Sequence, residues 1–402
     1  MSFKSKFEFG GPGALVAAAF IGPGTVTVCT LAGARHGLQL LWAVGLSIFM
    51  TLLFQEMSAR LGIVTQLDLT SLVKQKIANP VLKGLVLAVV LASIVIGNGA
   101  YEAGNISGGA LGLQTFISTR TLTFHWLPVL IGASSFLLLW FGNSSLLEKS
   151  LATLVGVMSI AFITSAVLIR PNIVELLNGL FIPKIPENGQ LIVLGVIGTT
   201  IVPYNLFLHA SLAKEKWRNS SDLSSARKDT ILSILIGGLI SMAIVISASS
   251  LQGEEINNAL DLGKGLESTF GSFARYLISI GFLAAGITSA ITAPLAAAYV
   301  MSGGFGWNAD RFDWRFRTTW ALILGVGVLF SSLGFKPIDV IRFAQVCNGL
   351  LLPLIGFLLV WLSSRSSILG IYKNKKITTI VSSILLILIA TIGIKSILAA
   401  FI

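Results

Sequence analysis

The sequence predicts an all-α polytopic membrane protein of about eleven transmembrane helices, arranged as two inverted repeats of five spans. Hydrophobic residues make up 54% of the chain and charged residues only 11%, and the mean hydropathy is +0.87, whereas a soluble domain carries about 25% charged residues. Two of the apolar segments are interrupted near mid-depth, at Gly22–Thr25 (Gly-Pro-Gly-Thr) and at Val202–Asn205 (Val-Pro-Tyr-Asn). Backbone groups freed at that depth must face protein or a water-filled cavity, so the interruptions predict two broken helices around a binding site.

Eleven segments are each about 20 residues long, the length that crosses the hydrocarbon core. They lie at residues 12–34, 38–59, 84–112, 126–147, 151–169, 189–212, 229–251, 270–301, 318–334, 341–363 and 377–400. The interruptions fall in spans 1 and 6, and a repeat of an odd number of spans must be inverted in the membrane. We therefore expect one transmembrane domain, 1–402, with a first repeat at 12–169, a second at 189–363 and an extra span at 377–400. The first apolar run lacks a small-residue cleavage site and is expected to be a retained span.

The basic residues are divided unequally between the two sides of this arrangement. Of the 28 Lys and Arg residues, 19 fall on one side and 9 on the other. The positive-inside rule then predicts a multi-pass protein of the cell (inner) membrane, with the N-terminus in the cytoplasm and the C-terminus outside. The net charge of +11 is explained by this topology, so the expected partner is the lipid bilayer and not nucleic acid.

Other classes of function have little support in the sequence. Cys29 and Cys347 both lie in apolar runs, which argues against a disulfide framework or a thiolate metal site. No nucleophilic triad, zinc signature or ATPase motif is present, so we expect neither an enzyme nor a bound cofactor. The sequence does not indicate an oligomeric state.

Short motifs follow one another along nearly the whole chain. They are Gly11-Pro12-Gly13 and Leu40-Leu41-Trp42 at the start of spans 1 and 2, Gln55–Gly62 at the end of span 2, Pro203–His209 in span 6, Gly281–Gly286 in span 8, and Ala344-Gln345-Val346 in span 10. In this order the motifs resemble the Nramp family of divalent-metal transporters. The resemblance implies a LeuT-type fold, alternating access and proton-coupled (symport) transport of a metal ion.

The chain departs from the family at the metal ligands. Family members show Asp-Pro-Gly-Asn in span 1 and Met-Pro-His-Asn in span 6, and the Asp, the first Asn and the Met ligate the metal. These three positions hold Gly22, Thr25 and Val202 here, and Tyr204 replaces the His. Manganese and iron prefer carboxylate or amide oxygen, with a thioether adding selectivity, and a dehydrated dication facing only neutral dipoles is expensive. The sequence thus predicts no metal-ligand set and makes a transition-metal substrate doubtful.

Two alternatives therefore stand beside metal transport. Half-helix N-termini attract anions and C-terminal carbonyls attract cations, so the interrupted spans suit a small organic solute such as an amino acid or a carboxylic acid. The other alternative is a membrane sensor or structural protein that does not transport.

The expected substrate site is made of residues at the two interruptions and one amide of span 10. They are Gly22, Gly24, Thr25, Thr199, Val202, Tyr204, Asn205 and Gln345. For Asn205 we favour a cap on the second half-helix over direct ligation, and Thr25 has the alternative of bonding to its own helix.

Two titratable residues are candidates for proton coupling. Glu102 is a carboxylate deep in span 3, where ionisable groups mark function by default, and His209 follows the span-6 interruption. Both fall at positions where the resemblance implies a proton route, although each also suits a purely structural, hydrogen-bonded role. Glu56, by contrast, has Arg60 at helical spacing and is expected to form an i,i+4 ion pair.

Overall fold

The computed structural model describes residues 12, 21–117, 126–141, 145–187, 189–256, 259–307, 310 and 312–401. Within these residues every regular element is a helix. The α-helices are α2 (Pro23–His36), α3 (Leu41–Thr65), α4 (Leu69–Lys76), α5 (Pro80–Gln114), α6 (Trp126–Phe141), α7 (Ser145–Ile169), α8 (Ile173–Phe181), α9 (Gln190–Thr200), α10 (Pro203–Lys216), α11 (Leu223–Ser249), α12 (Ala259–Phe270), α13 (Ala274–Phe305), α14 (Trp314–Ser331), α15 (Pro337–Ser364), α16 (Ser366–Leu369) and α17 (Lys376–Phe401). Three 3₁₀ turns complete the list, at Ser220–Asp222, Gly271–Phe273 and Gly370–Tyr372.

The polytopic prediction is confirmed. Seven helical stretches in the described part of the chain are long and apolar enough to cross a membrane, and two shorter apolar helices lie at Trp126–Phe141 and Thr153–Ile169. The second half of span 1 is α2, whereas residues 13–20 of its first half lie outside the described residues. Large apolar side chains are exposed along the spans, for example Ile96, Leu232 and Ile384. Such a surface fits a bilayer and would be costly in water.

The helices contact one another in pairs that repeat between the two halves. α2 packs on α11 of the second half, and α10 packs on α3 of the first half. In the same way α5 contacts α15 while α13 contacts α7, and the two long helices α5 and α13 lie against each other. Matching contacts of this kind are what an inverted repeat produces, because each helix of one half takes the place of its counterpart in the other.

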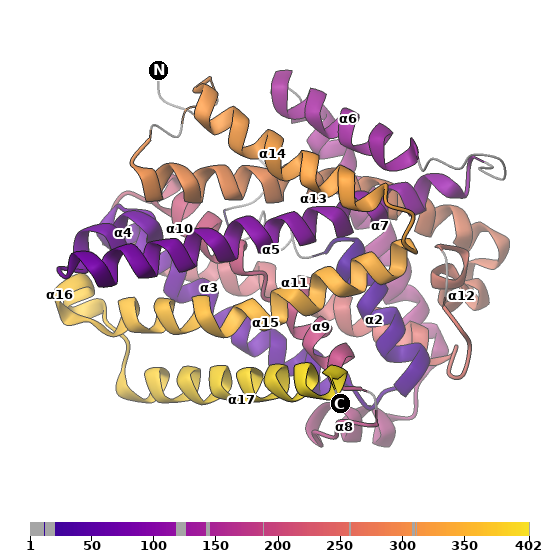
Figure 1. Ribbon diagram of the computed structural model, residues 1–402. Helices are drawn as coiled ribbons and strands as arrows, with labels where there is room; N and C mark the ends of the chain where they lie inside the picture. Colours follow the sequence, from indigo (N-terminus) through magenta and orange to yellow (C-terminus); the bar gives the residue numbers. More distant parts are fainter. Residues whose placement is uncertain are drawn as a thin grey trace.

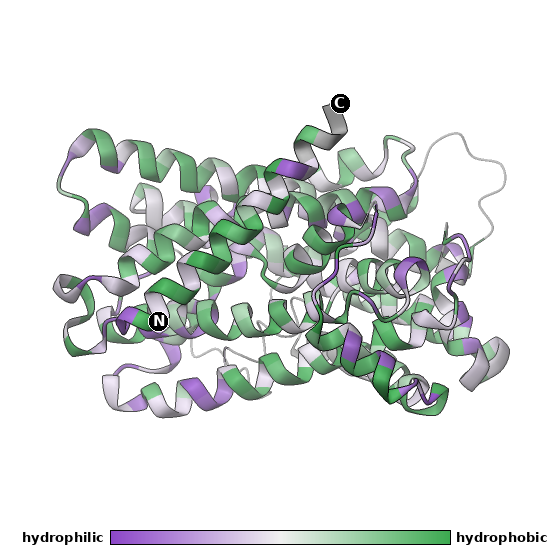
Figure 2. Ribbon diagram, turned by 90° about the horizontal axis from the view of Figure 1, so that it is seen from below, coloured by the Kyte–Doolittle hydropathy of each residue, from purple (hydrophilic) through white to green (hydrophobic). Residues whose placement is uncertain are grey.

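The long helices run roughly side by side between two ends of the molecule (Figure 1). One end, which we call the basic end, is formed by residues 66–79, 213–222, 306–307, 310, 312–313 and 365–375. Its segments are joined by a Lys214–Asp68 ion pair of 3.6 Å and by Lys74 lying against Gly306. α4 and α16 lie at this end and α12 lies at the other (Figure 1). Apolar residues line the lengths of the helices, and hydrophilic residues gather toward their ends (Figure 2).

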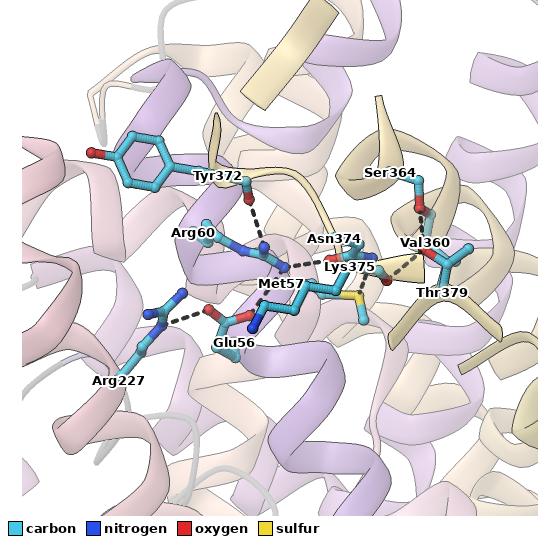
Figure 3. A network of polar contacts seen from close by, with 10 residues as sticks. All are labelled: Glu56, Met57, Arg60, Arg227, Val360, Ser364, Tyr372, Asn374, Lys375 and Thr379. Carbon is cyan, nitrogen blue, oxygen red and sulfur yellow. Dashed lines mark hydrogen bonds and ion pairs between the residues drawn. The ribbon is translucent and has the colours of Figure 1, made fainter. Parts of the chain in front are cut away.

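A polar network at the basic end ties α3 to two other parts of the chain (Figure 3). Glu56 pairs with Arg60 at 3.1 Å, which confirms the predicted i,i+4 ion pair, and also with Arg227 of α11 at 2.9 Å. Arg60 further donates to the carbonyl of Tyr372 at 2.6 Å and to Asn374 Oδ1 at 2.5 Å. The buried guanidinium thus anchors the segment that leads into the extra span α17.

Candidate functional site

Span 6 is broken between α9 and α10. The helix ends at Thr200, Ile201 and Val202 leave the helical conformation, and α10 starts at Pro203. Proline suits the first helical position because its missing N–H would be unpaired there in any case. The break exposes the carbonyl end of one half-helix and the N–H end of the next at the same depth.

Span 1 has the same organisation. α2 starts at Pro23, and the preceding Gly22 is extended, with φ −112° and ψ −175°. Neither α2 nor α10 has a side-chain hydrogen bond at its N-cap, which is Gly22 in one and Val202 in the other. Each of these helix N-termini therefore carries a partial positive charge that no N-cap side chain compensates.

The two breaks meet each other. Thr25 Oγ1 lies 2.8 Å from Thr199 Oγ1, which joins the start of α2 to the end of α9. Both threonines are completely buried, as are Val202 and Asn205. The structure therefore brings the predicted residues of both interruptions together in an occluded position.

Gln345 of α15 covers this meeting point. A Cβ added to Gly24 would overlap the Nε2 and Cδ atoms of Gln345, so the amide lies directly on the backbone of the span-1 break. On the other side, a Cβ on Gly198 would overlap the carbonyl oxygen of Gln345 and would lie 2.5 Å from the Gly349 nitrogen. The glycines let α15 approach both broken spans, which places Gln345 in the site.

Tyr204 connects the break to α5. Its ring meets that of Tyr101 edge to face, with ring centroids 5.3 Å apart.

The next residue of α5, Glu102, is fully buried. Its Oε2 accepts a hydrogen bond from Asn105 Nδ2 at 3.2 Å, and its Oε1 has no partner in the structure. The side chain faces α14, where a Cβ on Gly327 would overlap the Glu102 Cγ.

His209 lies one turn beyond Asn205 on α10 and is fully buried. Its Nδ1 is 2.9 Å from Gln55 Oε1 of α3, whereas its Nε2 has no partner among the residues that the structure describes. The next contacts along this α3–α10 interface are a hydrogen bond from Ser58 to the Leu206 carbonyl and the close approach of Gly62 to Ala210. His209 thus lies beside the site, on the helix that leads away from it. It does not belong to the group formed by Thr25, Thr199 and Gln345.

The predicted capping role of Asn205 is wrong. The helix begins two residues earlier, at Pro203, so Val202 is the N-cap and Asn205 already lies inside the first turn. Within the described part of the chain, both polar atoms of its buried side chain lack a partner, as does Gln345 Oε1. Unpartnered buried amides are expensive, and here they supply free donors and acceptors next to the break.

The site offers neutral groups to a ligand. Among the residues that the structure describes, no three His, Cys, Asp or Glu side chains form a group that could hold a metal ion. The donors that converge are hydroxyls, amides and helix ends. Such groups hydrogen-bond well to carboxylate and ammonium groups, and they compensate a bare dication poorly.

Three features of the site were missed by sequence reasoning. Tyr101 and Gln55 supply the partners of Tyr204 and His209 from other spans, and Gly198 permits the close crossing of α9 and α15. Tyr101 is the neighbour of the buried Glu102 and Gln55 precedes the ion-paired Glu56, but no spacing pattern within one span reveals contacts between spans.

Comparison with known proteins places the whole chain in one family. Residues 13–399 match the model of the natural resistance-associated macrophage protein-like (Nramp) family. The divalent metal cation transporter MntH of Staphylococcus saprophyticus is 29% identical over 99% of this chain and 94% of its own, and that of Bacillus subtilis is 27% identical with the same coverage.

Solved structures agree on the fold. A variant of the Eremococcus coleocola manganese transporter superposes with a TM-score of 0.78 at 22% identity, covering 98% of this chain and 88% of its own. MhsT in complex with L-phenylalanine gives a TM-score of 0.62 at 16% identity, covering 95% and 98%. The chain therefore belongs to the Nramp family and is a multi-pass membrane transporter, not an enzyme, with a LeuT-type fold built on two inverted repeats and broken helices 1 and 6.

Proposed function

We propose that the chain is a secondary-active transporter that works by alternating access at the paired breaks. The meeting of Thr25 and Thr199 in a fully buried position supports an occluded substrate site. The repeats would comprise 12–169 and 189–363, with 377–400 added. One repeat moving against the other would open the site to each side in turn.

The substrate that the geometry supports best is a small organic solute with a carboxylate, an ammonium group or both. The observation that carries this proposal is the pair of uncapped helix N-termini, α2 and α10, beside the carbonyl end of α9. A carboxylate at the N-termini and an ammonium group at the carbonyl end would each meet a complementary partial charge. Tyr204 would add an aromatic face next to an ammonium group.

Divalent-metal transport is the second candidate. It is favoured by the names of the relatives, which are divalent metal cation and manganese transporters. The unpartnered amide oxygens of Asn205 and Gln345 are ligands that a hard cation accepts. Gly22 and Val202 argue against metal transport, because neither provides the carboxylate or thioether that stabilises a transition metal.

A calorimetric titration of the purified protein separates the candidates. We expect small amino acids or carboxylic acids to bind and micromolar Mn²⁺ to give no heat of binding, because the site lacks a countercharge. The matched variants are Gln345→Ala, at the site, and Gln252→Ala, an exposed glutamine outside it. Tight Mn²⁺ or Mg²⁺ binding that Gln345→Ala abolishes would establish the metal candidate instead. If none of these ligands binds, both substrate candidates are wrong.

Proton coupling through Glu102 and His209 is part of the proposal. Both side chains are buried, and among the described residues one oxygen of Glu102 and one ring nitrogen of His209 have no partner. Groups of this kind can bind and release a proton when the surrounding helices rearrange.

We further propose that the basic end faces the cytoplasm, with the N-terminus inside and the C-terminus outside the cell membrane. The measurement is labelling of single cysteines with an impermeant maleimide in intact cells, after Cys29 and Cys347 have been replaced. Arg227→Cys should stay unlabelled, because the excess of basic residues keeps this end inside. Lys184→Cys, at the opposite end, is the control that should label. The reverse pattern would invert the topology.

A further inference from the structure

A group of arginine and aromatic side chains lies where α6 ends, α13 ends and α14 begins. We call it the arginine–tryptophan patch, and its members are Arg315, Arg317, Trp140, Trp307, Phe312 and Trp314. The Arg315 guanidinium carbon lies 5.7 Å from the ring centroids of both Trp307 and Trp314. That of Arg317 lies 4.3 Å from Trp140 and 5.4 Å from Phe312. Two cations are thus held on four aromatic rings from three parts of the chain.

Three of the four rings of the patch are exposed, and that of Trp307 is half-buried. Trp314 is 70% exposed, Phe312 65% and Trp140 43%. The patch continues into the apolar outer surface of α13 and α14 through Phe305 and Leu322, which are also exposed. Tryptophan prefers the boundary between the hydrocarbon core and the headgroups, so the patch belongs at headgroup level.

Three described cations of this region, Arg315, Arg317 and Lys74, stand against two carboxylates, Asp310 and Asp313. Asp313 is engaged as the cap of α14, accepting the Arg315 backbone N–H at 2.8 Å, and Asp310 accepts the Phe312 N–H at 3.0 Å. Among the described residues, no carboxylate forms an ion pair with Arg315, which is exposed. Lys74 adds a third cation beside Gly306, at the end of α13.

We infer that this patch binds the headgroup of an anionic phospholipid. Arginine presents a planar fork of N–H donors that matches phosphate oxygens, and stacking on tryptophan fixes the fork in place. The exposed rings would lie along the glycerol and upper acyl region while the guanidinium groups contact the phosphate. The patch lies apart from the substrate site, so the inference does not depend on the proposed function.

Native mass spectrometry of the full chain in detergent, titrated with phosphatidylglycerol or phosphatidylcholine, tests this inference. The wild type should bind phosphatidylglycerol more tightly. Changing both arginines, in Arg315→Gln/Arg317→Gln, should weaken phosphatidylglycerol binding by about fivefold for each arginine and leave phosphatidylcholine binding unchanged. The control is Arg365→Gln, whose guanidinium lies outside the patch on a single tryptophan, 5.0 Å from the Trp361 ring.

A second variant separates charge from packing. Arg315→Lys/Arg317→Lys keeps both charges and should retain most of the preference for phosphatidylglycerol, since lysine also binds phosphate. Equal affinity of the wild type and the glutamine variant would overturn the inference, as would a lysine variant as weak as the glutamine one. Displacement of the lipid by inorganic phosphate at similar concentration would also overturn it, because the site would then recognise a free anion.

Discussion

Replacing Gly198 with alanine is expected to destabilise the protein by about 3 kcal/mol or more, near the upper end of the usual cost of overpacking. The added Cβ would overlap the carbonyl oxygen of Gln345 and would lie 2.5 Å from the Gly349 nitrogen. Both atoms belong to the backbone, so no side-chain rotation can relieve the overlap and α9 must move away from α15. This movement would also separate Gln345 from the breaks and weaken substrate binding.

Thermal unfolding of the purified protein measures this effect. Gly325→Ala is the matched control, because it is also a helical glycine but a Cβ there meets nothing within 4 Å. That variant should be neutral or slightly stabilising, since alanine is the better helix former by about 1 kcal/mol. A Gly198→Ala protein that melts with the wild type would show that α9 and α15 are not held by this crossing.

The same crossing illustrates what the sequence can and cannot predict. Hydropathy and length suffice for the spans, because every spanning helix must satisfy its backbone internally and be about 20 residues long. The short helices α4, α8 and α12 were not predicted, since each is too brief to give a spanning signal and lies at an end of the molecule. Proline marked both breaks because it suits the first position of a helix, although proline does not break every span, since Pro294 and Pro353 lie inside α13 and α15.

Contacts between spans are the part that sequence reasoning could not supply. The placement of Gln345 over Gly24 depends on how α15 crosses α2, and the pairing of Tyr204 with Tyr101 depends on how α10 meets α5. For Asn205, the predicted position of the helix start was wrong. Asparagine is a good cap, but Pro203 starts the helix before it, and Asn205 is left with an unpartnered buried amide.

Glu102→Gln is expected to abolish pH-driven accumulation of the substrate while leaving its exchange across the membrane intact. Glutamine keeps the size of the side chain and can still accept the hydrogen bond from Asn105, so the contacts of α5 with α14 should survive. It cannot bind or release a proton. In proteoliposomes with an imposed pH gradient, the ratio of inside to outside substrate should fall to about one, since an uncoupled carrier only equilibrates its substrate.

Two comparisons decide what Glu102 does. Glu254→Gln removes an exposed carboxylate that pairs with Lys264 at 2.9 Å, and it should accumulate substrate like the wild type. If Glu102 instead pairs with an ammonium group of the substrate, Glu102→Gln should lose binding itself, and a titration would show this before any transport is measured. Full accumulation by Glu102→Gln with unchanged pH dependence would exclude both roles. Glu102 would then be a structural acid, buried between α5 and α14 for the hydrogen bond that it accepts from Asn105.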